Sequence, residues 1–94
     1  MIMSQIKHLI ESAKHYLDNE LLNDESPGSD YAKITFAKFI RDLEDSKSLA
    51  EMKQAVAELS YHVADQFNFE QSYCDRISDY LAKIANVLDN GNRS

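Results

Sequence analysis

The chain contains very few of the residues that interrupt regular structure, with two glycines and one proline in 94 residues. A protein built from many short strands needs frequent turns, and turns draw on glycine and proline. Their scarcity therefore disfavours an all-β fold. The length suits one domain with one hydrophobic core, so we expect residues 1–94 to form a single helical domain.

Other absences narrow the class of protein. The single cysteine, Cys74, cannot form an internal disulfide, which favours a cytoplasmic location. No apolar run approaches the roughly 18 residues of a membrane span, and the N-terminal segment lacks the continuous apolar stretch of a signal peptide.

Basic residues are also few, with 10 against 16 acids and a formal charge of −6. Nucleic-acid backbones and anionic lipids are both bound by basic faces. We therefore expect no direct nucleic-acid binding and no membrane binding. The charge favours a basic protein partner instead.

Apolar residues recur at steps of three and four along most of the chain, which places them on one face of a helix. This pattern predicts helices at about residues 4–22, 30–45, 48–67 and 69–89, with a frayed tail at 90–94. The third pattern is the most regular and resembles a coiled-coil seam. Its members are Leu49, Met52, Val56, Leu59, Val63 and Phe67.

Local signals mark several helix ends. Ser48 with Glu51 fits a capping box, and Asn68 with Gln71 is a cap of the same kind. Asn90–Gly91 is typical of a left-handed C-terminal stop. The connections between helices are short, which makes consecutive helices antiparallel neighbours. The sequence thus predicts an all-α fold, an antiparallel up-down four-helix bundle.

Three histidines each precede an acid by three residues, which raises the question of a metal site. Metal-binding bundles project their ligands inward from facing helices. His8 and His15 instead lie opposite the apolar stripe of the first helix, and His62 flanks the stripe of the third. We interpret all three as surface or boundary residues and expect no metal and no cofactor.

A cysteine nucleophile with His62 as its base is the main catalytic alternative. Acidic neighbours such as Asp75 and Asp79 would raise the pKa of the Cys74 thiol, and only Arg76 opposes them. A small buried or boundary cysteine is therefore the preferred interpretation. Neither glycine lies in a phosphate-binding loop, so we expect no enzyme.

Three tyrosines are placed by the same helical projection. Tyr73 and Tyr80 fall on the apolar face of the fourth helix, and we expect them at the edge of the core with hydroxyls reaching water. Tyr61 projects almost opposite the stripe of the third helix and is expected to be exposed.

The segment 16–32 contains five acids and no lysine or arginine. Ser29 and Asp30 suit the start of the second helix, where polar caps and negative charge are favoured. Asp24 and Glu25 follow the end of the first helix, where the helix dipole disfavours anions. Local stability therefore does not explain these two acids.

A further feature follows this turn. At about 100° per residue, Ile34 projects nearly opposite the apolar side of the second helix, and Tyr31 lies about 60° from it. An aromatic anchor beside carboxylates is typical of a site that recognises a basic partner. The alternative is that both residues pack over the loop or a neighbouring helix. The predicted partner-binding residues are Asp24, Glu25, Asp30, Tyr31 and Ile34.

Gly28-Ser29-Asp30-Tyr31 is similar to a segment of the nuclease-colicin immunity proteins, which are small acidic four-helix domains that bind a basic nuclease. The resemblance covers these four residues and implies that Asp30 and Tyr31 contact a toxin. In length and architecture the chain also resembles the pediocin-like bacteriocin immunity proteins. Immunity proteins paired with contact-dependent toxins are a third branch of this kind.

We therefore expect a cytoplasmic bacterial immunity protein that binds a basic toxin domain, foremost a nuclease, and blocks its active site. Two alternatives stay open. The seam of the third helix and Tyr61 favour a self-associating structural or regulatory protein, such as a homodimer. The acidic composition also fits a phage anti-defence protein that mimics nucleic acid.

Overall fold

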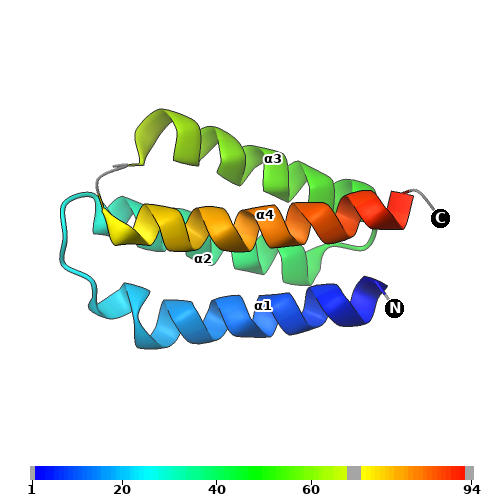
Figure 1. Cartoon of the computed structure of the whole chain (residues 1–94), viewed down its shortest axis with the longest axis horizontal. Helices are drawn as coiled ribbons and strands as arrows, with labels where there is room; N and C mark the ends of the chain where they lie inside the picture. Colours follow the sequence, from blue (N-terminus) through cyan, green and yellow to red (C-terminus); the bar gives the residue numbers. More distant parts are fainter. Residues whose placement is uncertain (1, 68–70, 93–94) are drawn as a thin grey trace.

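The protein is an antiparallel four-helix bundle in the computed structural model, which describes residues 2–67 and 71–92 (Figure 1). The predicted all-α up-down fold is confirmed. α1 and α3 each pack against both α2 and α4, and α2 and α4 also touch one another. The elements are α1 (Ile2–Asn19), a short 3₁₀ helix η1 (Leu21–Asn23), α2 (Ser29–Asp45), α3 (Leu49–Gln66) and α4 (Ser72–Asn92).

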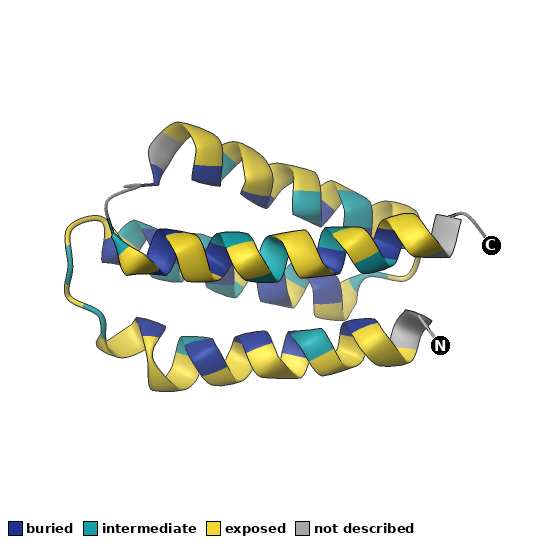
Figure 2. Cartoon of the chain, viewed as in Figure 1, coloured by how far each residue is buried: buried dark blue, intermediate teal, exposed yellow. Residues whose placement is uncertain are grey.

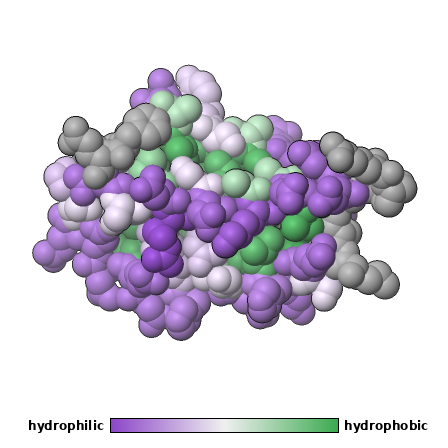
Figure 3. All heavy atoms as spheres, in the orientation of Figure 1, coloured by the Kyte–Doolittle hydropathy of each residue, from purple (hydrophilic) through white to green (hydrophobic). Residues whose placement is uncertain are grey.

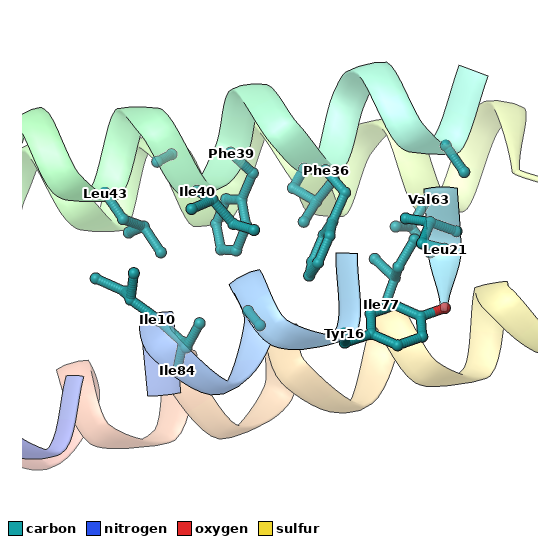
Figure 4. Packing of buried hydrophobic residues seen from close by; sticks show 14 of the residues in the cluster. Ile10, Tyr16, Leu21, Phe36, Phe39, Ile40, Leu43, Val63, Ile77 and Ile84 are labelled. Carbon is teal, nitrogen blue, oxygen red and sulfur yellow. The ribbon is translucent and has the colours of Figure 1, made fainter. Parts of the chain in front are cut away.

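The core forms because each helix turns its apolar stripe toward the bundle axis (Figure 2). Phe36 lies at its centre, with its ring centroid 6.0 Å from that of Tyr16 and 6.1 Å from that of Phe39 (Figure 4). Full burial of one such side chain contributes about 1.5–3 kcal/mol. The Tyr16–Phe36 pair therefore joins α1 to α2 within the core.

The predicted seam of α3 is used within the monomer. Met52, Leu59, Val63 and Phe67 are buried in the common core, and Leu49 and Val56 pack against it. These side chains therefore face α2 and α4, and Leu49 and Val56 are only partly buried.

The first helix ends earlier than predicted. α1 stops at Asn19, and Glu20 adopts φ −123° and ψ −55°, outside the helical region. The chain then tightens into η1, which buries Leu21 and leaves Leu22 52% exposed. Arg76 of α4 holds the Glu20 carboxylate through two bonds of 3.1 and 3.2 Å. This long-range contact lies at the break, and the local apolar pattern does not contain it.

The start of α3 confirms the predicted cap. The Glu51 amide donates to the Ser48 hydroxyl oxygen at 3.2 Å, and the Glu51 carboxylate accepts from the Lys47 amide at 3.3 Å. The predicted bounds of 48–67 thus differ from Leu49–Gln66 by one residue at each end.

The ends of α4 differ from the prediction. It begins at Ser72, and the predicted start at 69 and the cap residue Asn68 lie outside the described residues. The predicted stop at Asn90–Gly91 is wrong, because α4 continues to Asn92. The predicted frayed tail is likewise wrong for residues 90–92, and 93–94 lie outside the described part. Burial of Leu88 holds the last turns against the core.

Candidate functional site at the acidic half of the bundle

Charge is divided unevenly along the long axis. The half that contains the η1–α2 loop, here called the acidic half, comprises residues 15–40, 56–67 and 71–81 (Figure 1). It holds nine acids and three bases, a formal charge of −6. The opposite, neutral half comprises residues 2–14, 41–55 and 82–92 and holds six of each. The remaining charged residues, Glu70 and Arg93, cancel. The whole net charge therefore lies in one half.

The three bases of the acidic half all have acidic partners. Arg76 pairs with Glu20, and Lys33 approaches Asp30 at 3.5 Å. Lys38 contacts Asp42 at 2.7 Å and, across the helix boundary, Glu58 at 3.8 Å. Since these cations are already engaged, they do little to offset the remaining carboxylates.

Four exposed acids of this half have no ion-pair partner within 4 Å among the described residues: Asp18, Glu25, Asp65 and Asp75. Only Glu25 belongs to the predicted site. The other three come from α1, α3 and α4, so the fold gathers unpaired carboxylates from all around one end of the bundle.

Asp24 has a local role that the sequence interpretation missed. Its carboxylate accepts hydrogen bonds from the Ser26 amide at 2.8 Å and from the Ser26 hydroxyl. These bonds, the hydroxyl bond first, lower the pKa of Asp24 below its ordinary value. The conclusion that local stability does not explain Asp24 is therefore wrong, because this side chain organises the turn.

The same turn corrects the predicted start of α2. Gly28 occupies the cap position with φ 83°, a left-handed conformation that glycine adopts without a steric penalty. Ser29 is buried, and its hydroxyl donates to the Asp24 carbonyl at 2.8 Å instead of capping the helix. Asp30 lies in the first turn with its side chain 95% exposed.

Tyr73 anchors this loop to α4. It is 1% exposed, and its hydroxyl donates to the Pro27 carbonyl at 2.8 Å. The prediction that this hydroxyl reaches water is wrong, since the loop folds over it. The loop that carries Asp24 and Glu25 is thus held by side-chain contacts at both of its ends.

A polar and aromatic cluster joins α1 to α4 below the loop. The Arg76 guanidinium lies 4.5 Å from the centroid of the Tyr16 ring while it pairs with Glu20. Burial raises the pKa of Tyr16 to about 12, and the hydrogen bond with Glu20 raises the pKa of Arg76 further above its ordinary value. At neutral pH the Tyr16 phenol is therefore neutral and the Arg76 guanidinium is positively charged. The cluster links α1 to α4 through these two side chains and Glu20.

The two apolar members of the predicted site differ in their surroundings. Ile34 is 70% exposed, as the helical projection predicts. Tyr31 is half-buried, and its hydroxyl lies 2.6 Å from Nδ1 of His62. The Tyr31 ring also packs edge-on against Phe67 at 6.0 Å. Tyr31 therefore joins α2 to α3, as the packing alternative predicts, and its ring is only partly open to a partner.

The acidic half also holds all three exposed large apolar side chains of the described residues. Tyr61 is 67% exposed, which confirms its predicted orientation, and Leu22 accompanies Ile34 and Tyr61. Leu22 was missed because it falls inside the helix predicted over 4–22. Negative charge and exposed apolar surface therefore coincide in the same half.

The features that would support catalysis are poorly placed. Cys74 is 2% exposed, and burial raises the pKa of its thiol, which opposes a nucleophilic role. One imidazole nitrogen of His62 is engaged by Tyr31. His8 and His15 are exposed, as predicted. Among residues 2–67 and 71–92, no three His, Cys, Asp or Glu side chains gather as metal ligands would.

The visible outer surface is mostly polar. Hydrophilic side chains form a band over the outer side of α4, and apolar side chains lie in the furrows beside it (Figure 3). Within the described part of the chain, no helix combines the length and apolarity needed to span a bilayer.

Comparisons of the chain with protein-family models, with curated proteins and with solved structures find no match.

Proposed function

We propose that this protein is a non-catalytic inhibitor, an immunity protein that binds a basic bacterial toxin domain in the cytoplasm and blocks its active site. The observation that carries the proposal is the charge distribution. The formal charge of −6 lies in one half of the bundle, together with exposed Leu22, Ile34 and Tyr61. Carboxylates steer a basic partner toward a surface, and apolar side chains then supply affinity.

A nuclease is the toxin class that this surface fits best. An enzyme that cleaves nucleic acid must hold phosphates, so its substrate surface is basic. A rigid, acidic end can occupy such a surface and exclude the substrate. Support for a rigid end comes from the loop, which Tyr73 and the Asp24–Ser26 turn hold in place.

The proposal is tested with the protein encoded in the neighbouring reading frame, if that frame encodes a nuclease toxin. We expect the purified chain to bind the toxin domain, to abolish its nuclease activity at equimolar ratio, and to rescue cell growth on co-expression. The association rate should fall steeply with salt, because long-range attraction is screened.

Charge reversal identifies the surface. Glu25→Lys combined with Asp30→Lys should slow association and weaken binding. Asp89→Lys is the control for each single reversal, since Asp89 is exposed in the neutral half and its reversal changes the net charge by the same amount. Binding that does not depend on salt, or that responds equally to both sets of changes, would contradict the proposal.

A further inference from the structure

The outer side of α2 and α3 in the acidic half carries two exposed apolar side chains, Ile34 and Tyr61. Ile34 follows Tyr31 by three residues and precedes Lys38 by four, so the three share one side of α2. Tyr61 has the same spacing from Glu58 and Asp65 on α3. We call this surface the α2–α3 face, and its members are Asp30, Ile34, Lys38, Glu58, Tyr61 and Asp65.

Direct contacts show that these two helix sides meet. The Tyr31 hydroxyl lies 2.6 Å from Nδ1 of His62, and Lys38 approaches Glu58 at 3.8 Å. On α3, the ring of Tyr61 lies 6.2 Å from that of its neighbour His62. Ile34 and Tyr61 therefore lie on the two helices that these contacts join, each turned away from the core.

The spacing of the two apolar side chains suggests the shape of a partner. Axes of packed helices are about 8–10 Å apart, and Ile34 and Tyr61 both project away from the core, so these two side chains are farther apart than the axes. Residues eleven apart along one helix are about 16 Å apart. A partner helix that crosses α2 and α3 can thus bring one apolar position to each of them.

Charge decides between a second copy and a different protein. The α2–α3 face has three acids and one base, and that base, Lys38, is held by Asp42 and Glu58. Two copies that met through this face would bring together two acidic halves of −6 each. Such charges repel within the Debye length of about 10 Å at 0.1 M salt. A basic occupant is attracted by the same field.

We propose that the α2–α3 face binds a basic, amphipathic helix of a protein partner. Ile34 and Tyr61 contact the apolar stripe of that helix, and Asp30 and Asp65 pair with its lysines or arginines. The inference rests on the proposed function in taking the partner to be a basic protein. It adds the face that is used and the secondary structure that it recognises.

Two peptides of identical composition test this surface without any toxin. The first is a helical peptide of leucine and lysine whose leucines form one stripe at positions i, i+3, i+4 and i+7. The second has the same residues in an order that scatters the leucines. We expect the striped peptide to bind at least about fivefold more tightly, since only it presents aligned anchors. Nuclear magnetic resonance of the ¹⁵N-labelled full chain should show the largest amide shifts around Ile34 and Tyr61.

Single substitutions then locate the anchors. Ile34→Ser and Tyr61→Ser should each weaken the striped peptide by about fivefold or more, while binding of the scattered peptide changes little. Ala82→Ser is the matched control, a change to serine at an exposed apolar position of α4 in the neutral half. Circular dichroism checks that each variant keeps its helices.

Several outcomes would overturn the inference. These are equal affinity for both peptides, an equal effect of Ala82→Ser, or amide shifts centred on the apolar groove of Ile6, Ile10 and Leu43 in the neutral half. Concentration-dependent shifts at Ile34 without peptide would show that a second copy covers the face. Because no toxin is used, these outcomes are separate from failure of the inhibitor proposal.

Discussion

Asp24 and Tyr73 lie far apart in the sequence, yet both serve the loop before α2. Asp24 binds Ser26 within the turn, and Tyr73 reaches the Pro27 carbonyl from α4. The loop's shape is therefore set by individual polar contacts, and deleting one hydroxyl removes either the Tyr73–Pro27 bond or one of the two Asp24–Ser26 bonds.

The Asp24–Ser26 contact should make stability depend on pH. The pKa of Asp24 is lowered in the fold, so its ionised form stabilises the protein above the ordinary value of 3.8. That contribution is lost as the pH falls through the lower folded-state pKa. Ser26→Ala removes the hydroxyl bond, so we expect it to lower the free energy of unfolding at pH 7 and to have a smaller effect near pH 3.

Urea denaturation at both pH values measures this difference. A titration of the Asp24 carboxyl by nuclear magnetic resonance should show a higher pKa in the Ser26→Ala variant. A destabilisation of the same size at pH 7 and pH 3 would show that the hydroxyl acts independently of the carboxylate.

The Tyr73 hydroxyl should contribute measurably to stability. Tyr73→Phe leaves the Pro27 carbonyl without this buried donor, and we expect a loss of about 1 kcal/mol in the free energy of unfolding. Tyr80→Phe is the control, because the Tyr80 hydroxyl bonds to Ser12 at an exposed position where water can replace it. Equal losses in the two variants, measured by denaturation, would contradict this account.

At the scale of the element, α3 and α1 show what local sequence determines. Ser48 and Glu51 are only three positions apart, so the sequence alone reveals this cap. At the end of α1, Glu20 pairs with Arg76, which is 56 residues away in the chain. A contact with such a distant partner leaves no signal in the local pattern.

The cap of α3 gives a direct test. Ser48→Ala removes the acceptor of the Glu51 amide, and we expect a loss of about 1 kcal/mol in the free energy of unfolding. Ser60→Ala is the matched control, an exposed serine within α3. It should be neutral or slightly stabilising, because alanine is the better helix former. Thermal denaturation compares the two, and a loss of equal size in both would rule out a capping role for Ser48.

Fold and candidate site were therefore predictable to different degrees. Helix number and direction follow from apolar periodicity and short loops, which are local properties. The site depends on contacts between elements. Tyr31 could be projected outward from α2, but its bond to His62 of α3 requires the folded arrangement. Asp65 and Asp75 lie on helices remote in sequence from the acidic loop, and only the bundle places them in the same half.

At the scale of the whole molecule, the charge distribution works against folding. Nine acids against three bases in one half repel one another, and the neutral half offers no such excess. This excess of acids lowers stability, so stability does not explain it. A binding surface that attracts a basic partner would explain it, because selection retains such a surface for its function.

Relief of this repulsion should stabilise the protein. Glu25 is exposed and has no ion-pair partner within 4 Å among the described residues. We expect Glu25→Lys to raise the melting temperature at low salt, and the gain to shrink at 1 M salt, where the Debye length falls to about 3 Å. Asp89→Lys in the neutral half should give little or no gain. Calorimetry at the two salt concentrations makes the comparison, and equal effects of the two reversals would mean that the repulsion is not confined to one half.

The arrangement of the helix ends has a practical consequence. The start of α1 and the end of α4 lie together at the end of the bundle opposite the η1–α2 loop (Figure 1). The molecule is 41 Å along this axis. A fluorophore, an affinity tag or a fused domain joined to either terminus would therefore be tethered at the pole remote from the carboxylates. A sensor chip coated through such a tether would present every copy with its acidic pole toward the solution.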